Sequence, residues 1–273
     1  MLIQRIVTAV ILAPLAVLIV LLPPNPAFAL IAALAFLAAG WEWTRLAGLQ
    51  SPAPRGALLA VQALLFALLW YLRSQALWSL LLVAGAAWWV LACVWLRHFA
   101  YGAAPTAENR NLKLLAGAFV IVPAWVALVQ VHDEIRPHAH AWTLLALLVV
   151  WAADIGAYFS GRRFGRRKLA PRISPGKTWA GAWGALVAGT LVLLAGGWML
   201  DARGLQLLGL AVLAPVMVAA SIVGDLLESL MKRHAQVKDS GALFPGHGGL
   251  LDRLDSVFAA LPVFALGKLL LGL

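Results

Sequence analysis

The stretch "ALWSLLLVAGAAWWVLACVWLR", residues 76–97, decides the fold class of this chain. Its only charged residue is the final arginine, and it is long enough to cross a bilayer, which takes roughly 20 apolar residues in a helix. Similar segments recur along the 273 residues, of which 63% are hydrophobic and 12% charged. A typical soluble domain has about twice that charged fraction. The sequence therefore predicts an all-α, polytopic helical membrane protein.

Working outward from this stretch, the apolar pattern predicts about nine transmembrane helices, separated by breaks rich in Pro, Gly or charge. We find no internal repeat and no soluble domain, and the single cysteine excludes an intrachain disulfide. Residues 1–273 thus form one integral membrane domain, with N-terminal helices in 1–140 and the catalytic helices and cytoplasmic loops in 141–273. The first apolar segment lacks a clear small-residue cleavage site, so we interpret it as a retained helix. The predicted helices are 5–22, 27–47, 56–72, 76–97, 112–131, 140–159, 178–200, 205–227 and 254–272.

The distribution of cations predicts the orientation of these helices, because Lys and Arg favour cytoplasmic loops. With the N-terminus inside, 17 of the 21 Lys and Arg residues fall on the cytoplasmic side. The C-terminus then faces out. Attraction to anionic lipid headgroups explains most of these scattered cations. The four on the other side are Arg73, Arg136, Arg203 and Lys268.

Acidic residues gather in one region of a chain that has only eleven of them. Carboxylates within or beside membrane helices are costly and tend to mark function. Asp225 and Glu228 are three apart, as are Asp252 and Asp255, and residues three apart share a helix face. Such pairs suit Mg²⁺, which takes hard oxygen ligands together with phosphate. The alternative is a set of interfacial salt bridges to nearby Lys and Arg. Six of the eleven are candidate site residues: Asp154, inside an apolar helix, and Asp225, Glu228, Asp239, Asp252 and Asp255.

A basic loop precedes the seventh predicted helix and reads "SGRRFGRRKLAPRISPGKTWAG", residues 160–181. Its "SPGKT" loosely resembles a phosphate-binding loop, but the full GxxxxGK[ST] pattern is absent and we expect no strand before it. The glycines of "GHGGLLDRLDS", residues 246–256, lie just before the last predicted helix, whose N-terminus could attract a phosphate. Acidic and basic clusters on one face of the membrane together favour a metal-bound polyphosphate over a loop that only sets topology.

Residues 229–256, "SLMKRHAQVKDSGALFPGHGGLLDRLDS", closely resemble the signature of the phosphatidate cytidylyltransferases. All fixed positions of that signature are filled, and the resemblance is strongest over about 150–256. Gly176 and Ala180 depart from the family pattern, where Lys and Glu are common. The resemblance implies synthesis of CDP-diacylglycerol and pyrophosphate from CTP and phosphatidic acid, with Mg²⁺, a second cation and a homodimer.

The resemblance also implies the site residues. The metal ligands carry over onto Asp225 and Asp252. His247 either donates to a phosphate or holds the turn, Asp255 is either a ligand or orients Arg253, and Ser229 is expected to bond locally. The catalytic set is Lys232, Arg233, Lys238, Asp239, His247, Arg253 and Asp255, and the substrate-binding set is Asp154, Ser174, Lys177, Thr178, Glu228, Ser229, Gly248 and Gly249.

Two other functions are compatible with polar groups in a membrane protein. One is a CTP-dependent polyprenol or dolichol kinase, which would need a base near its hydroxyl acceptor. The other is an ion-coupled transporter, which should carry its charges near the membrane midplane and in two repeats. Of the three, we expect synthesis of CDP-diacylglycerol from CTP and phosphatidic acid, in a bacterial inner membrane with the site facing the cytoplasm. Membrane lipids are the expected surroundings, and no nucleic-acid partner is expected.

Overall fold

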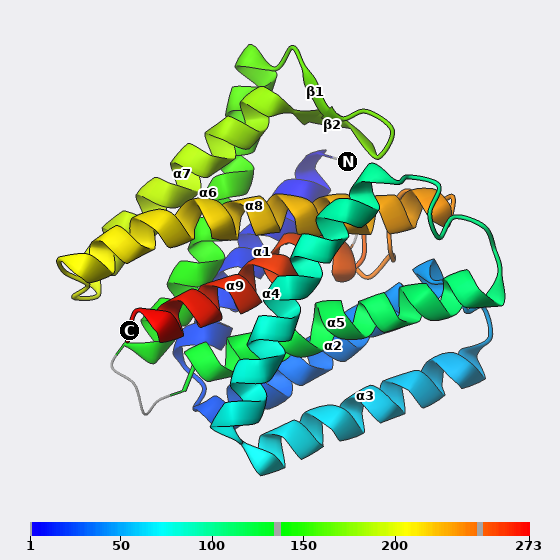
Figure 1. Cartoon of the computed structure of the whole chain (residues 1–273), viewed down its shortest axis with the longest axis horizontal. Helices are drawn as coiled ribbons and strands as arrows, with labels where there is room; N and C mark the ends of the chain where they lie inside the picture. Colours follow the sequence, from blue (N-terminus) through cyan, green and yellow to red (C-terminus); the bar gives the residue numbers. More distant parts are fainter. Residues whose placement is uncertain (1, 134–137, 245–247) are drawn as a thin grey trace.

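The computed structural model describes residues 2–133, 138–244 and 248–273, and its described part is almost entirely helical (Figure 1). Helices form at all nine predicted segments, with ends that differ by a few residues in most cases. The helices are α1 (Leu2–Leu21), α2 (Asn25–Leu46), α3 (Pro52–Leu72), α4 (Gln75–Arg97), α5 (Ala107–Val131), α6 (Ala139–Phe164), α7 (Trp179–Met199), α8 (Leu205–His234) and α9 (Leu251–Leu270).

Seven of the helices in the described residues, α2 to α8, are long and apolar enough to cross a membrane. Helix α9 has the length, but its 20 residues include four charged ones: Asp252, Arg253, Asp255 and Lys268. The protein is therefore a multi-pass membrane protein, and the number of nine spans stays a prediction.

The helices are arranged around α5 and α9, which are buried along most of their length. Helix α9 packs against α8, α5 and α4, while α3 lies at the periphery against α2. The rings of Phe36 on α2 and Phe258 on α9 meet edge to face, 4.8 Å apart. The last helix therefore sits inside the bundle, where it contacts elements from both halves of the chain.

Small residues let two helix pairs approach closely, as is usual in membrane proteins. A Cβ atom on Gly156 of α6 would collide with the backbone of Gly184 on α7. On α8, a Cβ atom on Gly224 would collide with the carbonyl oxygen of Asp255 on α9. The second contact brings together the two helices that carry four of the predicted site carboxylates: Asp225, Glu228, Asp252 and Asp255.

The basic loop differs from the prediction, because part of it forms a short antiparallel hairpin at the top of Figure 1. Strand β1 (Lys168–Ala170) pairs with β2 (Ser174–Thr178), and Lys168 lies opposite Thr178. The expectation that no strand precedes "SPGKT" is wrong. The stretch is nonetheless no P-loop, since it is itself the second strand, and Thr178 caps α7 by accepting a hydrogen bond from the Gly181 N–H at 3.1 Å.

Candidate functional site

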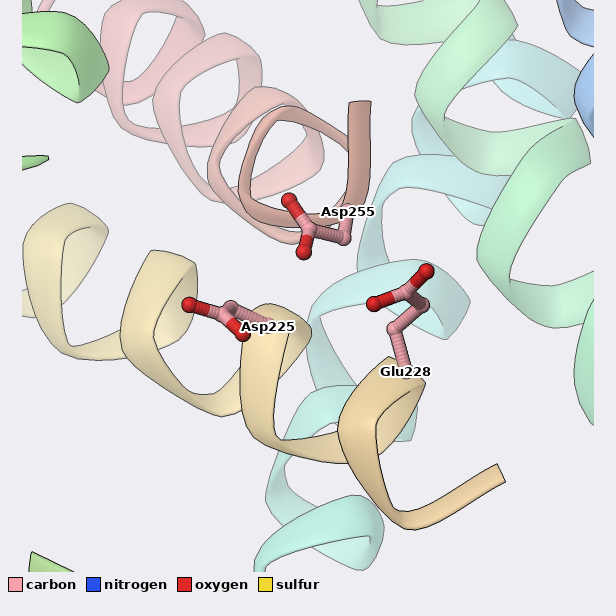
Figure 2. A group of neighbouring side chains, drawn as sticks. All are labelled: Asp225, Glu228 and Asp255. Carbon is pink, nitrogen blue, oxygen red and sulfur yellow. The ribbon is translucent and has the colours of Figure 1, made fainter. Parts of the chain in front are cut away.

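Three carboxylates converge where α8 passes the first turns of α9, as Figure 2 shows. Asp225 and Glu228 come from α8 and Asp255 from α9, and one oxygen of each lies within 4.8 Å of those of the other two. The Glu228 side chain is buried. The predicted face shared by Asp225 and Glu228 is thus present, and it is completed from the neighbouring helix.

A lysine from the hairpin reaches this cluster. The Lys177 ammonium forms an ion pair with Asp225, whose other oxygen accepts a hydrogen bond from the Ser229 hydroxyl at 3.2 Å. Both Lys177 and Asp225 line a cavity of about 430 Å³ between α6, α7, α8 and β2, and Asp154 lines it as well. The basic loop and the acidic helix therefore meet at one cavity, as the sequence analysis expected of a polyphosphate site.

Asp252 occupies a different position from the three clustered carboxylates. Its Oδ1 contacts Lys232 Nζ at 2.6 Å, and the same ammonium contacts Glu228 at 2.5 Å. Its Oδ2 accepts three hydrogen bonds, from the N–H and the hydroxyl of Ser240, both at 2.9 Å, and from the Gly249 N–H at 2.8 Å. Asp252 thus fastens the segment before α9 and reaches the cluster through Lys232.

Sequence reasoning missed Glu42, a buried carboxylate on α2. It accepts hydrogen bonds from the Ser240 hydroxyl at 2.7 Å and from the N–H groups of Leu250 and Leu251 at 3.1 and 2.9 Å. Arg45, one turn further along α2, donates to the Ser240 carbonyl. The available signal was a pair of charged residues inside an apolar helix, "WEWTR" at 41–45, which is costly without a role.

These contacts change one expectation about "GHGG". The N–H groups of residues 249–251, offered by the sequence to a phosphate, are taken by the carboxylates of Asp252 and Glu42. Gly248 has φ +82°, a conformation that favours glycine, and a Cβ atom there would collide with Asp252. The two described glycines thus allow the backbone to wrap around protein carboxylates.

The remaining predicted residues lie around this centre. Arg233 donates to the Ile173 carbonyl at 3.2 Å and so ties the end of α8 to the hairpin. Ser174 begins β2. His247 lies outside the described residues. The side chains of Lys238, Asp239 and Arg253 are exposed.

The alternative of interfacial salt bridges is met only in part. The nearby cations that could form such bridges are Lys232, Arg233, Lys238 and Arg253. Only Lys232 forms an ion pair with an acidic residue in the described part of the chain. The other partner is Lys177, from a distant segment. If all four carboxylates of α8 and α9 are ionised, these two ammonium groups leave two negative charges uncompensated.

The fold and these residues define a class: a multi-pass membrane protein with a site of carboxylates and lysines between its C-terminal helices and a basic hairpin. The profile of the Cytidylyltransferase family matches residues 3–270. The chain therefore belongs to this family.

Two relatives align over nearly the whole chain, and a third aligns over about half of it. The phosphatidate cytidylyltransferase of Pseudomonas aeruginosa is 44% identical over 265 residues, which cover 97% of this chain and 96% of that protein. The phosphatidate cytidylyltransferase of Haemophilus influenzae is 37% identical over 286 residues, with 97% and 98% covered. That of Synechocystis is 48% identical over 143 residues, which cover 51% of this chain and 47% of that protein.

Proposed function

We propose that this protein transfers CMP from CTP to phosphatidic acid, giving CDP-diacylglycerol and pyrophosphate. The observation that carries the proposal is the convergence of Asp225, Glu228 and Asp255 with Lys177 beside one cavity. The resemblance of residues 229–256 and the names of full-length relatives agree with it.

The reaction forms a bond between a phosphate oxygen of phosphatidic acid and the α-phosphorus of CTP. It breaks the bond from that phosphorus to the bridging oxygen, and pyrophosphate leaves with the electron pair. The attacking phosphate is already ionised near neutral pH, so no general base is needed. The difficulty is that one anion attacks another, and catalysis rests on positioning and charge stabilisation. Lys177, at the cavity, is placed to offset phosphate charge.

The donor set fits a hard divalent cation. Its three converging groups are all carboxylates, which Mg²⁺ prefers. When they and Asp252 are ionised, the two charges that Lys177 and Lys232 leave uncompensated match one such ion. A bound Mg²⁺ would stabilise charge on the phosphate oxygens and hold them in line for displacement. Asp225 is common to the ligand pair implied by the resemblance and to the group that converges here. Asp252 is the other member of the implied ligand pair, and Glu228 and Asp255 are the other members of the converging group.

Mutation of the aspartates tests the site. We expect Asp225→Asn and Asp252→Asn each to remove nearly all activity while the protein still enters the membrane. Asp225→Asn removes an anionic ligand, whereas Asp252→Asn also releases Lys232 and the N–H groups of residues 240 and 249. The measurement is turnover across a Mg²⁺ titration. Substantial turnover of either variant at saturating Mg²⁺ would remove that residue from the site.

A product assay separates this function from the two alternatives. Purified protein, labelled CTP and phosphatidic acid should give CDP-diacylglycerol in equimolar amount with pyrophosphate. In a parallel assay with a polyprenol in place of phosphatidic acid, a kinase would instead give CDP and a phosphorylated polyprenol, and a transporter would give no product in either assay. Absence of CDP-diacylglycerol from active, folded protein would reject the proposal.

We place the site on the cytoplasmic side of a bacterial inner membrane, where CTP is available. Charge distribution supports this, since the predicted nine-span topology puts 17 of the 21 Lys and Arg residues on the same side as the hairpin. Cysteines in a Cys93→Ser background test it: Gly176→Cys, where a Cβ atom meets open space, and the exposed Ala242→Cys. Both should resist an impermeant reagent added to intact cells, and the control Gln75→Cys should react. Labelling of either test site from outside would overturn the orientation.

We also propose a homodimer, as the family resemblance implies. Light scattering of the purified protein in detergent should give the protein mass of two chains. A mass of one chain at all concentrations would contradict it.

A further inference from the structure

A second polar cavity, of about 400 Å³, has none of the clustered carboxylates in its lining. The end of α2, the end of α8, the start of α5 and the segment between α4 and α5 enclose it, toward the right of Figure 1. It shares no lining residue with the cavity beside Lys177. We call it the cationic pocket, after three of its lining residues: Arg45, Arg110 and Lys113.

The lining of the cationic pocket is one-sided in charge, because no Asp or Glu lines it within the described residues. Arg110 and Lys113 are three apart on α5 and so share a face, together with Thr106, the N-cap of that helix. Neither Arg110 nor Lys113 forms a side-chain hydrogen bond or ion pair among the residues the structure describes. Among the same residues, Arg45 donates only to the Ser240 carbonyl.

Lys113 is the most informative of these cations, because only 6% of it is exposed. A mostly buried lysine is costly unless its charge meets water or a counter-ion, and the protein offers no such partner in the described residues. Setting membrane topology requires a cation on one side of the bilayer and does not require its burial. The enclosed position of Lys113 is explained if an anion occupies the pocket.

We propose that the cationic pocket binds a phosphate group, separately from the site of CMP transfer. Guanidinium groups match phosphate geometry, the start of α5 adds a helix N-terminus, and the volume is that of an ordinary ligand pocket. The phosphate comes either from an anionic lipid headgroup or from free phosphate in solution. The proposal does not depend on the proposed activity.

Thermal unfolding in detergent tests binding of free phosphate directly. Inorganic phosphate is titrated in the presence of EDTA against chloride at matched ionic strength. We expect a saturable rise in the unfolding midpoint of the wild type. Lys113→Met keeps the apolar stem but loses the charge, and Arg110→Gln is a second variant at a less buried position. Each should raise the half-saturating phosphate concentration at least about tenfold, since a hydrogen bond to a charged group is lost.

Two control variants make the test specific. Arg97→Met removes an exposed cation that does not line the pocket, and it should respond as the wild type does. Lys177→Ala alters the other cavity and should also keep the response, so a failure of the proposed activity would not affect the result.

A second arm tests the lipid source by native mass spectrometry of protein from nanodiscs of phosphatidylglycerol or phosphatidylcholine. A retained phosphatidylglycerol that is lost in Lys113→Met and Arg110→Gln, but kept in Arg97→Met, assigns the pocket to a headgroup. A phosphate response without a retained lipid assigns it to free phosphate. Absence of both signals, or equal loss in Arg97→Met, would overturn the proposal.

Discussion

Replacement of Glu42 by Gln should disturb the carboxylate cluster, although Glu42 is about 200 residues away from it in sequence. The Glu42 carboxylate accepts from the Ser240 hydroxyl and from the N–H groups of Leu250 and Leu251. A glutamine has the same shape but a single acceptor oxygen. Whichever way the amide turns, its NH₂ group faces a donor and at least one buried donor loses its partner.

The size of the effect follows from these contacts. Hydrogen bonds to charged groups contribute about 1.5–3 kcal/mol each, and Gln retains weaker versions of one or two, so we expect a loss of about 2–4 kcal/mol in unfolding free energy. The start of α9 would also shift, and it carries Asp252 and Asp255. Because a misplacement of about 1 Å can cost roughly a hundredfold, we expect kcat/KM to fall roughly tenfold to a hundredfold.

The assay measures thermal unfolding and CDP-diacylglycerol formation per folded protein across a Mg²⁺ titration. The control is Asp201→Asn, the same chemical change at an exposed residue, where an effect within about 1 kcal/mol is expected. If Glu42 has only a structural role, Glu42→Gln would lower stability. The turnover per folded protein and its dependence on Mg²⁺ would then stay unchanged. That result would refute positioning, and unchanged stability would refute the energetic argument as well.

Two further predictions concern the hairpin and the contact between α8 and α9. Lys177→Ala should lower kcat/KM roughly ten- to over a hundredfold, since a charge-assisted contact of about 1.5–3 kcal/mol is lost. Arg167→Ala, at an exposed residue of the same loop, should cost little at the same salt concentration, and equal small losses would make the loop a diffuse positive surface. Gly224→Ala should destabilise the protein by about 1–3 kcal/mol because its methyl group would meet α9, while Gly176→Ala, in open space, should not; equal unfolding midpoints would contradict the packing argument.

Hydropathy predicted the helices well but ended some of them too early. Helix α8 continues to His234, beyond the predicted end at residue 227, and α6 continues to Phe164, beyond 159. In both cases the helix goes on after its side chains become polar. An apolar pattern ends where a polar site begins, so the method stops at the residues that matter for function.

Sequence spacing placed each acidic pair on one helix face but could not show which groups would meet. Asp255 faces Asp225 and Glu228 because α8 and α9 approach closely at Gly224. Asp252, one turn earlier, meets Ser240 and Gly249. Contacts between helices depend on their rotation and separation, which a spacing of three residues within one helix does not contain.

The contacts of Lys232 explain how the N-terminal helices take part in a site that the sequence assigned to residues 141–273. Lys232 joins Glu228 of the cluster to Asp252, Asp252 shares the Ser240 hydroxyl with Glu42, and Glu42 belongs to α2. Buried charges joined in this way are costly to break singly, since each loss leaves another charge unpaired. The positions of the carboxylates at the cluster therefore depend on α2 as well as on α8 and α9, and the division at residue 140 describes the sequence motifs better than it describes the site.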